Sequence, residues 1–192
     1  MRRVVAVLSV LVFAAVACGG DGEDNTSARP TPSVSPSPKP CSVPNGSTER
    51  RESDIRPETA PLTDVRYDDD GCPRIVFEFP DHEPDYVVEY AEPPFSECGS
   101  GDAVPTSAWG ANAYLTVRLE PSGTADLTKE EAPLTYEGGR DIDVGGDVLK
   151  HLKVICDFES VLQWVVGLDE RHDFTVFALD DPPRVVIDIS QT

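Results

Sequence analysis

The chain contains little positive charge. Only 16 of its 192 residues are Lys or Arg, against 35 Asp and Glu, which gives a formal net charge of −19 at pH 7. Such a surplus repels the phosphate backbone of nucleic acids and the anionic head groups of membranes. We therefore expect no nucleic acid partner and no basic helix that binds a membrane surface. Polycations, divalent metal ions and neutral glycans remain possible ligands.

Motifs for catalysis are also lacking. The sequence contains no GxSxG, HExxH or P-loop pattern, and Gly99-Ser100-Gly101 lacks the third glycine of a GxGxxG loop. We predict that the protein is not an enzyme and uses no cofactor. The alternative is a hydrolase that works with two carboxyl groups, as glycosidases do. The carboxylates available for such a pair are Asp157, Glu159, Asp180, Asp181 and Asp188.

Long hydrophobic runs are rare, and the clearest one is at the N-terminus. Two arginines precede the apolar run Val4–Val16, which ends in small residues directly before Cys18. The run is shorter than the roughly 20 residues that a spanning helix needs. Residues 1–18 therefore resemble a bacterial lipoprotein signal peptide, although Ala15 stands where Leu is usual. A lipid such as palmitate on Cys18 would anchor the chain at the extracytoplasmic face of the cell membrane.

The segment that follows has few apolar residues. Residues 19–60 are rich in Pro, Ser and Thr, and they include RPTPSVSPSPKP at residues 29–40. A composition of this kind cannot bury enough apolar surface to fold, and its frequent prolines favour an extended polyproline II chain. We expect a disordered linker over residues 19–60 and a single folded domain over residues 61–192.

Apart from Cys18, four cysteines are spread over the rest of the chain. An even number of cysteines in an extracytoplasmic protein indicates disulfides, here two, with three possible pairings. No two of these cysteines have the spacing of a zinc site, so we expect no metal there. We favour the pairs Cys41–Cys72 and Cys98–Cys156, of which the first would tie the start of the domain to its first hairpin.

The region from about Leu62 to Ile189 alternates apolar and polar residues, which is typical of half-buried strands. No long window keeps the apolar stripe of a helix. The sequence therefore predicts an all-β fold, a single β-sandwich of about eight strands. The apolar strand segments are Ile75–Phe79, Tyr86–Tyr90, Leu115–Leu119, Leu152–Phe158, Val161–Leu168, Phe174–Leu179 and Arg184–Ile189.

Two long polar segments, Pro93–Asn112 and Pro121–Gly146, interrupt the strands. Loops longer than about 15 residues are usually functional or mobile, so we expect any binding surface there. Trp109 in the first segment is the better candidate for an exposed platform that stacks on a sugar ring. Trp164 alternates with apolar strand residues and is expected in the core.

Five segments occur in the order and spacing of a known family. They are RIVFEFPDHEPDYVVEYAEPP (74–94), GSGDAVP (99–105), AYLTVRLEPS (113–122), CDFESVLQWVVGLD (156–169) and FTVFALDDPPRVVIDI (174–189). Together they resemble the AMIN-like domain of lipoproteins from high-GC Gram-positive bacteria. The resemblance implies a β-sandwich related to the AMIN domain, a non-catalytic module that places cell-wall amidases and secretin-type proteins at the envelope, with peptidoglycan as its ligand.

On this basis we expect a lipid-anchored envelope protein that binds peptidoglycan or another envelope component. A protein-interaction subunit without a small ligand is a further alternative. The motifs that match the family best are Asp157-Phe158-Glu159 and Asp180-Asp181-Pro182-Pro183-Arg184. Arg184 could pair with Asp157 or Glu159 across the end of a sheet, either to hold a hairpin corner or to bind a ligand. The candidate ligand-binding residues are Trp109, Asp157, Glu159, Asp181 and Arg184.

Two features depart from the family pattern. The cysteines Cys41, Cys72, Cys98 and Cys156 are additional, which suggests local stapling. Ser160 stands where the family has glycine after Asp-Phe-Glu, which argues against a tight turn at that point.

Overall fold

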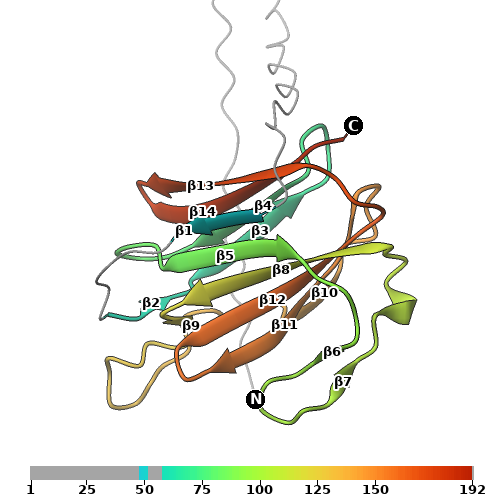
Figure 1. The fold of residues 1–192 in the computed structure, drawn as a ribbon. Coiled ribbons are helices and arrows are strands. Elements are labelled where there is room, and N and C mark those ends of the chain that lie inside the picture. The colour runs from blue at the N-terminus through green and yellow to red at the C-terminus, as the bar shows by residue number, and fades with distance from the viewer. Residues whose placement is uncertain (1–47, 52–57, 192) are drawn as a thin grey trace, which may run out of the picture. The chain divides into compact units, whose positions relative to one another are not determined.

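A computed structural model describes residues 48–51 and 58–191, which all belong to one unit of the chain. Almost all regular structure is strand (Figure 1). Two antiparallel sheets dominate. The larger has the order β1 (Thr48–Arg51), β5 (Asp85–Tyr90), β8 (Ala113–Glu120), β12 (Val161–Leu168), β11 (Leu149–Phe158), β10 (Asp141–Asp143). The smaller has the order β13 (Phe174–Asp180), β14 (Pro183–Ile189), β4 (Arg74–Glu78), β3 (Asp64–Asp68).

The two sheets share one hydrophobic core, to which every second residue of their central strands contributes. Val117 and Trp164 of the larger sheet and Phe77 and Ile187 of the smaller sheet are fully buried in it. The rings of Phe77 and Trp164 have centroids 5.8 Å apart. Alternate residues reach the core because successive side chains of a strand point to opposite faces. The predictions of an all-β sandwich and of a buried Trp164 are confirmed.

A second, smaller core lies on the opposite face of the larger sheet. Here the segment Pro93–Asn112 forms strands β6 (Phe95–Ser96) and β7 (Ala103–Val104) and the 3-10 helix η1 (Thr106–Ala108). The buried residues of this core are Phe95, Val104, Tyr114, Ile155 and Val165. The disulfide Cys98–Cys156 links this outer layer to β11, which confirms that pairing. The segment is thus a packed layer instead of an open loop.

The other long segment, residues 121–146, carries two further strands. β9 (Ser122–Gly123) pairs in parallel with β2 (Ala60–Pro61), and β10 forms one edge of the larger sheet. The register of β10 stops at the pair Asp141 and Lys153, so β11 continues for several residues past its neighbour. Beyond that pair, Arg140 and Cys98 make single backbone hydrogen bonds to Val154 and Ile155, so this edge of β11 is only partly covered.

The seven segments expected as strands all form strands, with small differences at their ends. Strands β3 and β10 alternate polar and apolar residues over only five and three residues, and neither they nor the two-residue strands are among the expected strands. Strand β1 lies within residues 19–60, so at least part of the expected linker forms a strand. Cys72 is disulfide-bonded, whereas its expected partner Cys41 and the expected lipid site Cys18 lie outside the described residues. No helix in the described part is long and apolar enough to cross a membrane.

Candidate functional site

An irregularity in β11 decides the orientation of Asp157. The register between β11 and β12 shifts between Val154 and Cys156, which leaves Ile155 as an extra residue. A β-bulge of this kind changes the phase of the side chains that follow. Asp157 consequently stands opposite Leu162, a fully buried core residue. Without the bulge, the alternation would place Asp157 on the outer face.

The carboxylate of Asp157 accepts hydrogen bonds from two neighbours. Thr124 donates from its backbone N–H at 3.2 Å and from its hydroxyl at 2.5 Å, and Arg140 Nη1 donates at 2.8 Å. Burial alone would raise the pKa of Asp157, but the hydrogen bonds from Thr124 and Arg140 outweigh it and lower the pKa. Asp157 is therefore an ionised anchor that holds Arg140 beside the end of β11.

A groove of about 300 Å³ runs along the last residues of β11. Its lining includes two cations, three carboxylates and one apolar ring, which are Arg140, Lys153, Glu97, Asp141, Asp157 and Phe158. Lys153 Nζ lies 2.9 Å from Asp141 Oδ2 and 3.4 Å from Glu97 Oε1. The groove thus presents both signs of charge beside the partly covered edge of the larger sheet.

Two of the groove carboxylates, Asp141 and Asp157, do not suit the general acid of a glycosidase pair. A general acid in such a pair needs a raised pKa. Burial acts to raise the pKa of Asp141, but hydrogen bonds with Lys153 and His151 outweigh it and lower that pKa. The pKa of Asp157 is lowered in the same way. Asp188, another carboxylate considered for the pair, instead forms an ion pair with Arg74 on the smaller sheet.

Glu159 and Ser160 form a two-residue turn between β11 and β12. Their φ angles are +50° and +62°, and the flanking residues Phe158 and Val161 pair with each other. Positive φ at both positions defines a type I′ hairpin turn. The expectation that Ser160 argues against a tight turn is wrong, because Ser160 adopts the left-handed conformation itself. The side chain of Glu159 is exposed in this turn.

Arg184 does not pair with Asp157 or Glu159, contrary to expectation. Its guanidinium donates to the carbonyl oxygens of Pro182 at 2.9 Å and Asp181 at 3.1 Å. Both belong to the turn that joins β13 to β14 in the smaller sheet, whereas Asp157 is in the larger sheet and pairs with Arg140. A guanidinium two residues beyond a turn reaches the carbonyls of that turn without crossing the sheet. The motif therefore holds a hairpin corner.

Trp109 is half-buried on the outer face of the larger sheet. Its ring stacks on His151, with centroids 4.2 Å apart and an interplanar angle of 12°. It also lies over Gly167, where a Cβ atom would come within 3.2 Å of the Trp109 ring. Because His151 covers one ring face, Trp109 is less open than the platform expected for sugar stacking.

Thr124, Arg140 and Lys153 carry no motif in the sequence. The only signal for Thr124 and Arg140 is the length of the segment 121–146 that contains them. Their meeting with Asp157 depends on the docking of β10 beside β11 and on the bulge at Ile155. Neither feature is visible in the alternation of apolar and polar residues.

Comparison with protein families gives a match to the AMIN-like domain over residues 60–191. The match includes the groove and every strand of the two large sheets except β1. No curated protein and no solved structure matches the chain.

Proposed function

Because the chain belongs to the AMIN-like domain family, we propose that it is a non-catalytic envelope module that binds peptidoglycan or another envelope component. The family match carries this proposal. Cys18 carries a lipid at the extracytoplasmic face of the membrane after cleavage directly before it, which removes the preceding part of the signal peptide segment 1–18. Most of residues 19–60 link this anchor to the domain of residues 61–192, whose larger sheet also includes Thr48–Arg51 as strand β1.

The groove along the end of β11 is the proposed contact surface. Peptidoglycan combines neutral sugar rings with short peptides that carry free carboxylates and amino groups. Arg140 and Lys153 are suited to carboxylates, because charge-assisted hydrogen bonds are the strongest available there. Phe158 is 60% exposed, and its ring offers an apolar surface to a sugar ring.

The existing ion pairs of the groove set the character of the binding. Lys153 already pairs with Asp141 and Glu97, so a ligand carboxylate exchanges one ion pair for another. Such an exchange gives modest affinity, and salt weakens it by screening the exposed charges. We therefore expect binding that is reversible and sensitive to salt.

Sedimentation of the full chain with insoluble peptidoglycan, with and without added salt, tests the proposal. We expect the chain in the pellet at low salt, and a loss of at least half of the bound fraction in Lys153→Gln. The matched control is Arg66→Gln, which removes an ion-paired cation from the smaller sheet. A chain that stays in the supernatant under both conditions, or equal losses in the two variants, would overturn the groove proposal.

The lipid anchor needs a separate experiment. Cells that express the chain are grown with a fatty-acid analogue, and Cys18→Ser serves as the matched variant. We expect the analogue on the parent chain and none on the variant. An unlabelled parent chain would remove the anchor from the proposal and leave the groove proposal untouched.

A further inference from the structure

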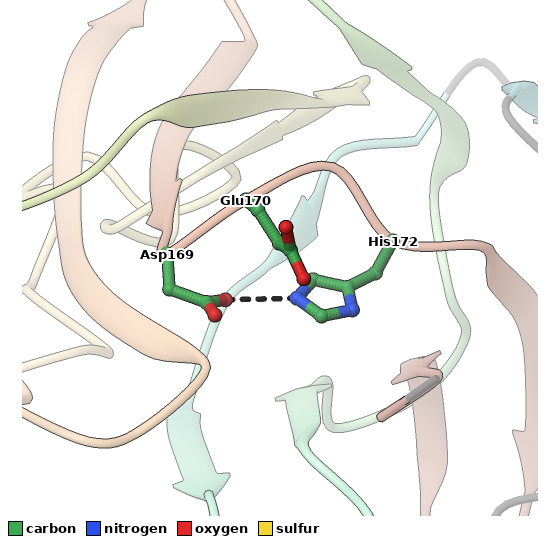
Figure 2. Close-up of side chains that lie close together, drawn as sticks. All are labelled: Asp169, Glu170 and His172. Carbon is green, nitrogen blue, oxygen red and sulfur yellow. Dashed lines mark hydrogen bonds and ion pairs between the residues drawn. The ribbon is translucent and has the colours of Figure 1, made fainter.

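The loop between β12 and β13 brings an imidazole and two carboxylates together (Figure 2). One ligand atom from each of Asp169, Glu170 and His172 lies within 4.8 Å of the others. We propose that these side chains bind a divalent transition metal ion that prefers mixed nitrogen and oxygen ligands, with Zn²⁺ as the type ion. This site is separate from the groove and does not depend on the proposed function.

Hydrogen bonds to the backbone of this loop fix its conformation, and they do not involve the side-chain atoms proposed as ligands. The hydroxyl of Tyr90 accepts a hydrogen bond from the N–H of His172 at 2.8 Å and donates to the C=O of His172 at 2.6 Å. Asn112 Nδ2 donates to the C=O of Asp169 at 2.8 Å, and the N–H of Asp169 donates to Val148 at 3.0 Å. Such support from outside preorganises the side chains that the loop presents.

The cation of the loop is engaged elsewhere. The guanidinium of Arg171 lies over the ring of Tyr90, 4.0 Å from its centroid. In the described part of the chain, no ion pair joins Arg171 to Asp169 or Glu170. Arg171 therefore does not compete with an incoming cation for the two carboxylates, and the strong acidity of the whole chain also attracts such a cation.

The geometry suits a small ion with three protein ligands and one open position. Zinc bonds of about 2.0 to 2.2 Å in a tetrahedral arrangement place ligand atoms about 3.3 Å apart. His172 Nε2 and Asp169 Oδ1 are 2.8 Å apart and joined by a hydrogen bond. The ion takes the place of the proton in that bond, which leaves to solvent or moves to Nδ1, and the Asp169 carboxylate rotates slightly to admit the ion. That carboxylate is 34% exposed whereas the imidazole is 5% exposed, so the ion enters from the carboxylate side. The imidazole disfavours Ca²⁺ and Mg²⁺, which prefer oxygen ligands alone.

A second His–Asp pair in the same domain provides a matched comparison. His151 Nε2 lies 2.6 Å from Asp141 Oδ1, and the imidazole is likewise almost buried. The third group there is Lys153, whose Nζ is 2.9 Å from Asp141 Oδ2. Lys153 thus stands beside this pair as Glu170 stands beside the pair of Asp169 and His172. Its positive charge repels a metal ion. We therefore assign metal binding to the pair with the carboxylate neighbour only.

Calorimetric titration of the full chain with Zn²⁺, after removal of metal with a chelator, tests the site. We expect one saturable site per chain. Glu170→Gln, a change of an exposed side chain, should weaken binding at least tenfold, as should Asp169→Asn, whereas Asp141→Asn should bind as the parent does. Circular dichroism of each variant confirms that it is folded.

Co²⁺ in place of Zn²⁺ gives an independent readout, since its visible absorption reports nitrogen and oxygen ligands in a tetrahedral site. We expect these bands in the parent chain and in Asp141→Asn, and their loss in Glu170→Gln. The proposal is overturned if the parent chain binds no Zn²⁺, if Glu170→Gln binds as tightly as the parent, or if Asp141→Asn is weakened equally.

Discussion

The two ends of strand β12 each have an aspartate nearby, and the two are held differently. Beside the start of β12, Asp157 accepts three hydrogen bonds, from Thr124 and Arg140. Just after its end, Asp169 accepts one side-chain hydrogen bond, from His172. A carboxylate offers about four lone-pair positions. Asp157 is therefore almost saturated, whereas Asp169 keeps most of its capacity within the described part of the chain.

This difference indicates which aspartate can bind a ligand directly. The donors around Asp157 come from the protein, so its carboxylate stabilises the fold and positions Arg140 at the groove. Asp169 has an exposed carboxylate neighbour in Glu170, and its remaining positions can accept a cation. A motif residue can thus support a site without contacting the ligand. The two ends should respond differently to the changes below.

Removal of the Cys98–Cys156 disulfide should have the largest effect on the free energy of unfolding, and it should also affect the groove near the start of β12. The two cysteines are 58 residues apart, and the entropy of a loop of that length predicts a loss of about 4 kcal/mol in the free energy of unfolding. The variant Cys98→Ser with Cys156→Ser is compared with the parent chain by urea unfolding, with sucrose to keep it folded. Peptidoglycan binding should fall, because both cysteines line the groove.

Zinc titration of the same folded variant sharpens the comparison. The loop of Asp169 and His172 is fixed through Tyr90 and Asn112, which do not involve the disulfide. Zinc affinity should therefore stay within about twofold of the parent value. A large loss of zinc affinity in a folded variant would show that the two ends are coupled.

The change Tyr90→Phe should affect the loop that follows the end of β12. It leaves the N–H and C=O of His172 without their partner, and an unsatisfied buried group costs about 1 to 3 kcal/mol. We expect a loss of about 2 kcal/mol in urea unfolding. Tyr114→Phe is the control, because that hydroxyl makes one longer hydrogen bond, 3.2 Å, to Ala111. Equal losses of stability in the two variants would show that the two hydrogen bonds between the Tyr90 hydroxyl and the His172 backbone do not stabilise the loop.

Asp157→Asn tests the carboxylate that is almost saturated with hydrogen bonds, through the pH dependence of the free energy of unfolding. Hydrogen bonds to a charged group contribute about 1.5 to 3 kcal/mol, so the variant should be less stable by about 1.5 kcal/mol at neutral pH. The pKa of Asp157 is lowered in the folded chain, so its contribution is complete above the unfolded value of about 3.9 and is lost as the pH falls through the folded pKa.

Urea unfolding of parent and variant between neutral pH and about pH 2 measures this effect. The difference in stability should narrow as the pH falls below about 4. Asp180→Asn, an exposed position at the end of β13, should give no difference at any pH. A constant difference for Asp157→Asn over the whole range would show that charge is not the cause.

The fold follows from local patterns, whereas the site depends on pairings between distant segments. The alternation at Ile75–Phe79 and at Val161–Leu168 predicts strands because one face of each sheet is buried. The Cys98–Cys156 link was one of three possible pairings, and the confirmed choice rests on little more than position. By contrast, the partner of Asp157 could not be predicted, because Arg140 lies in a polar segment without periodicity. The bulge at Ile155 also has no signature in the sequence.

The smallest expected effect concerns the turn that starts β12. Ser160 has a φ of +62°, a conformation that costs an L-residue free energy but costs glycine little. Ser160→Gly should therefore raise the free energy of unfolding by about 0.5 to 1 kcal/mol, after subtraction of the extra entropy of glycine in the unfolded chain. Ser107→Gly in η1 is the control, where the backbone is right-handed and glycine should destabilise slightly. Urea unfolding measures both. If Ser160→Gly is no more stable than the parent, the contact between the hydroxyls of Ser160 and Thr59 outweighs the backbone strain, and the turn is fixed by its side chain instead.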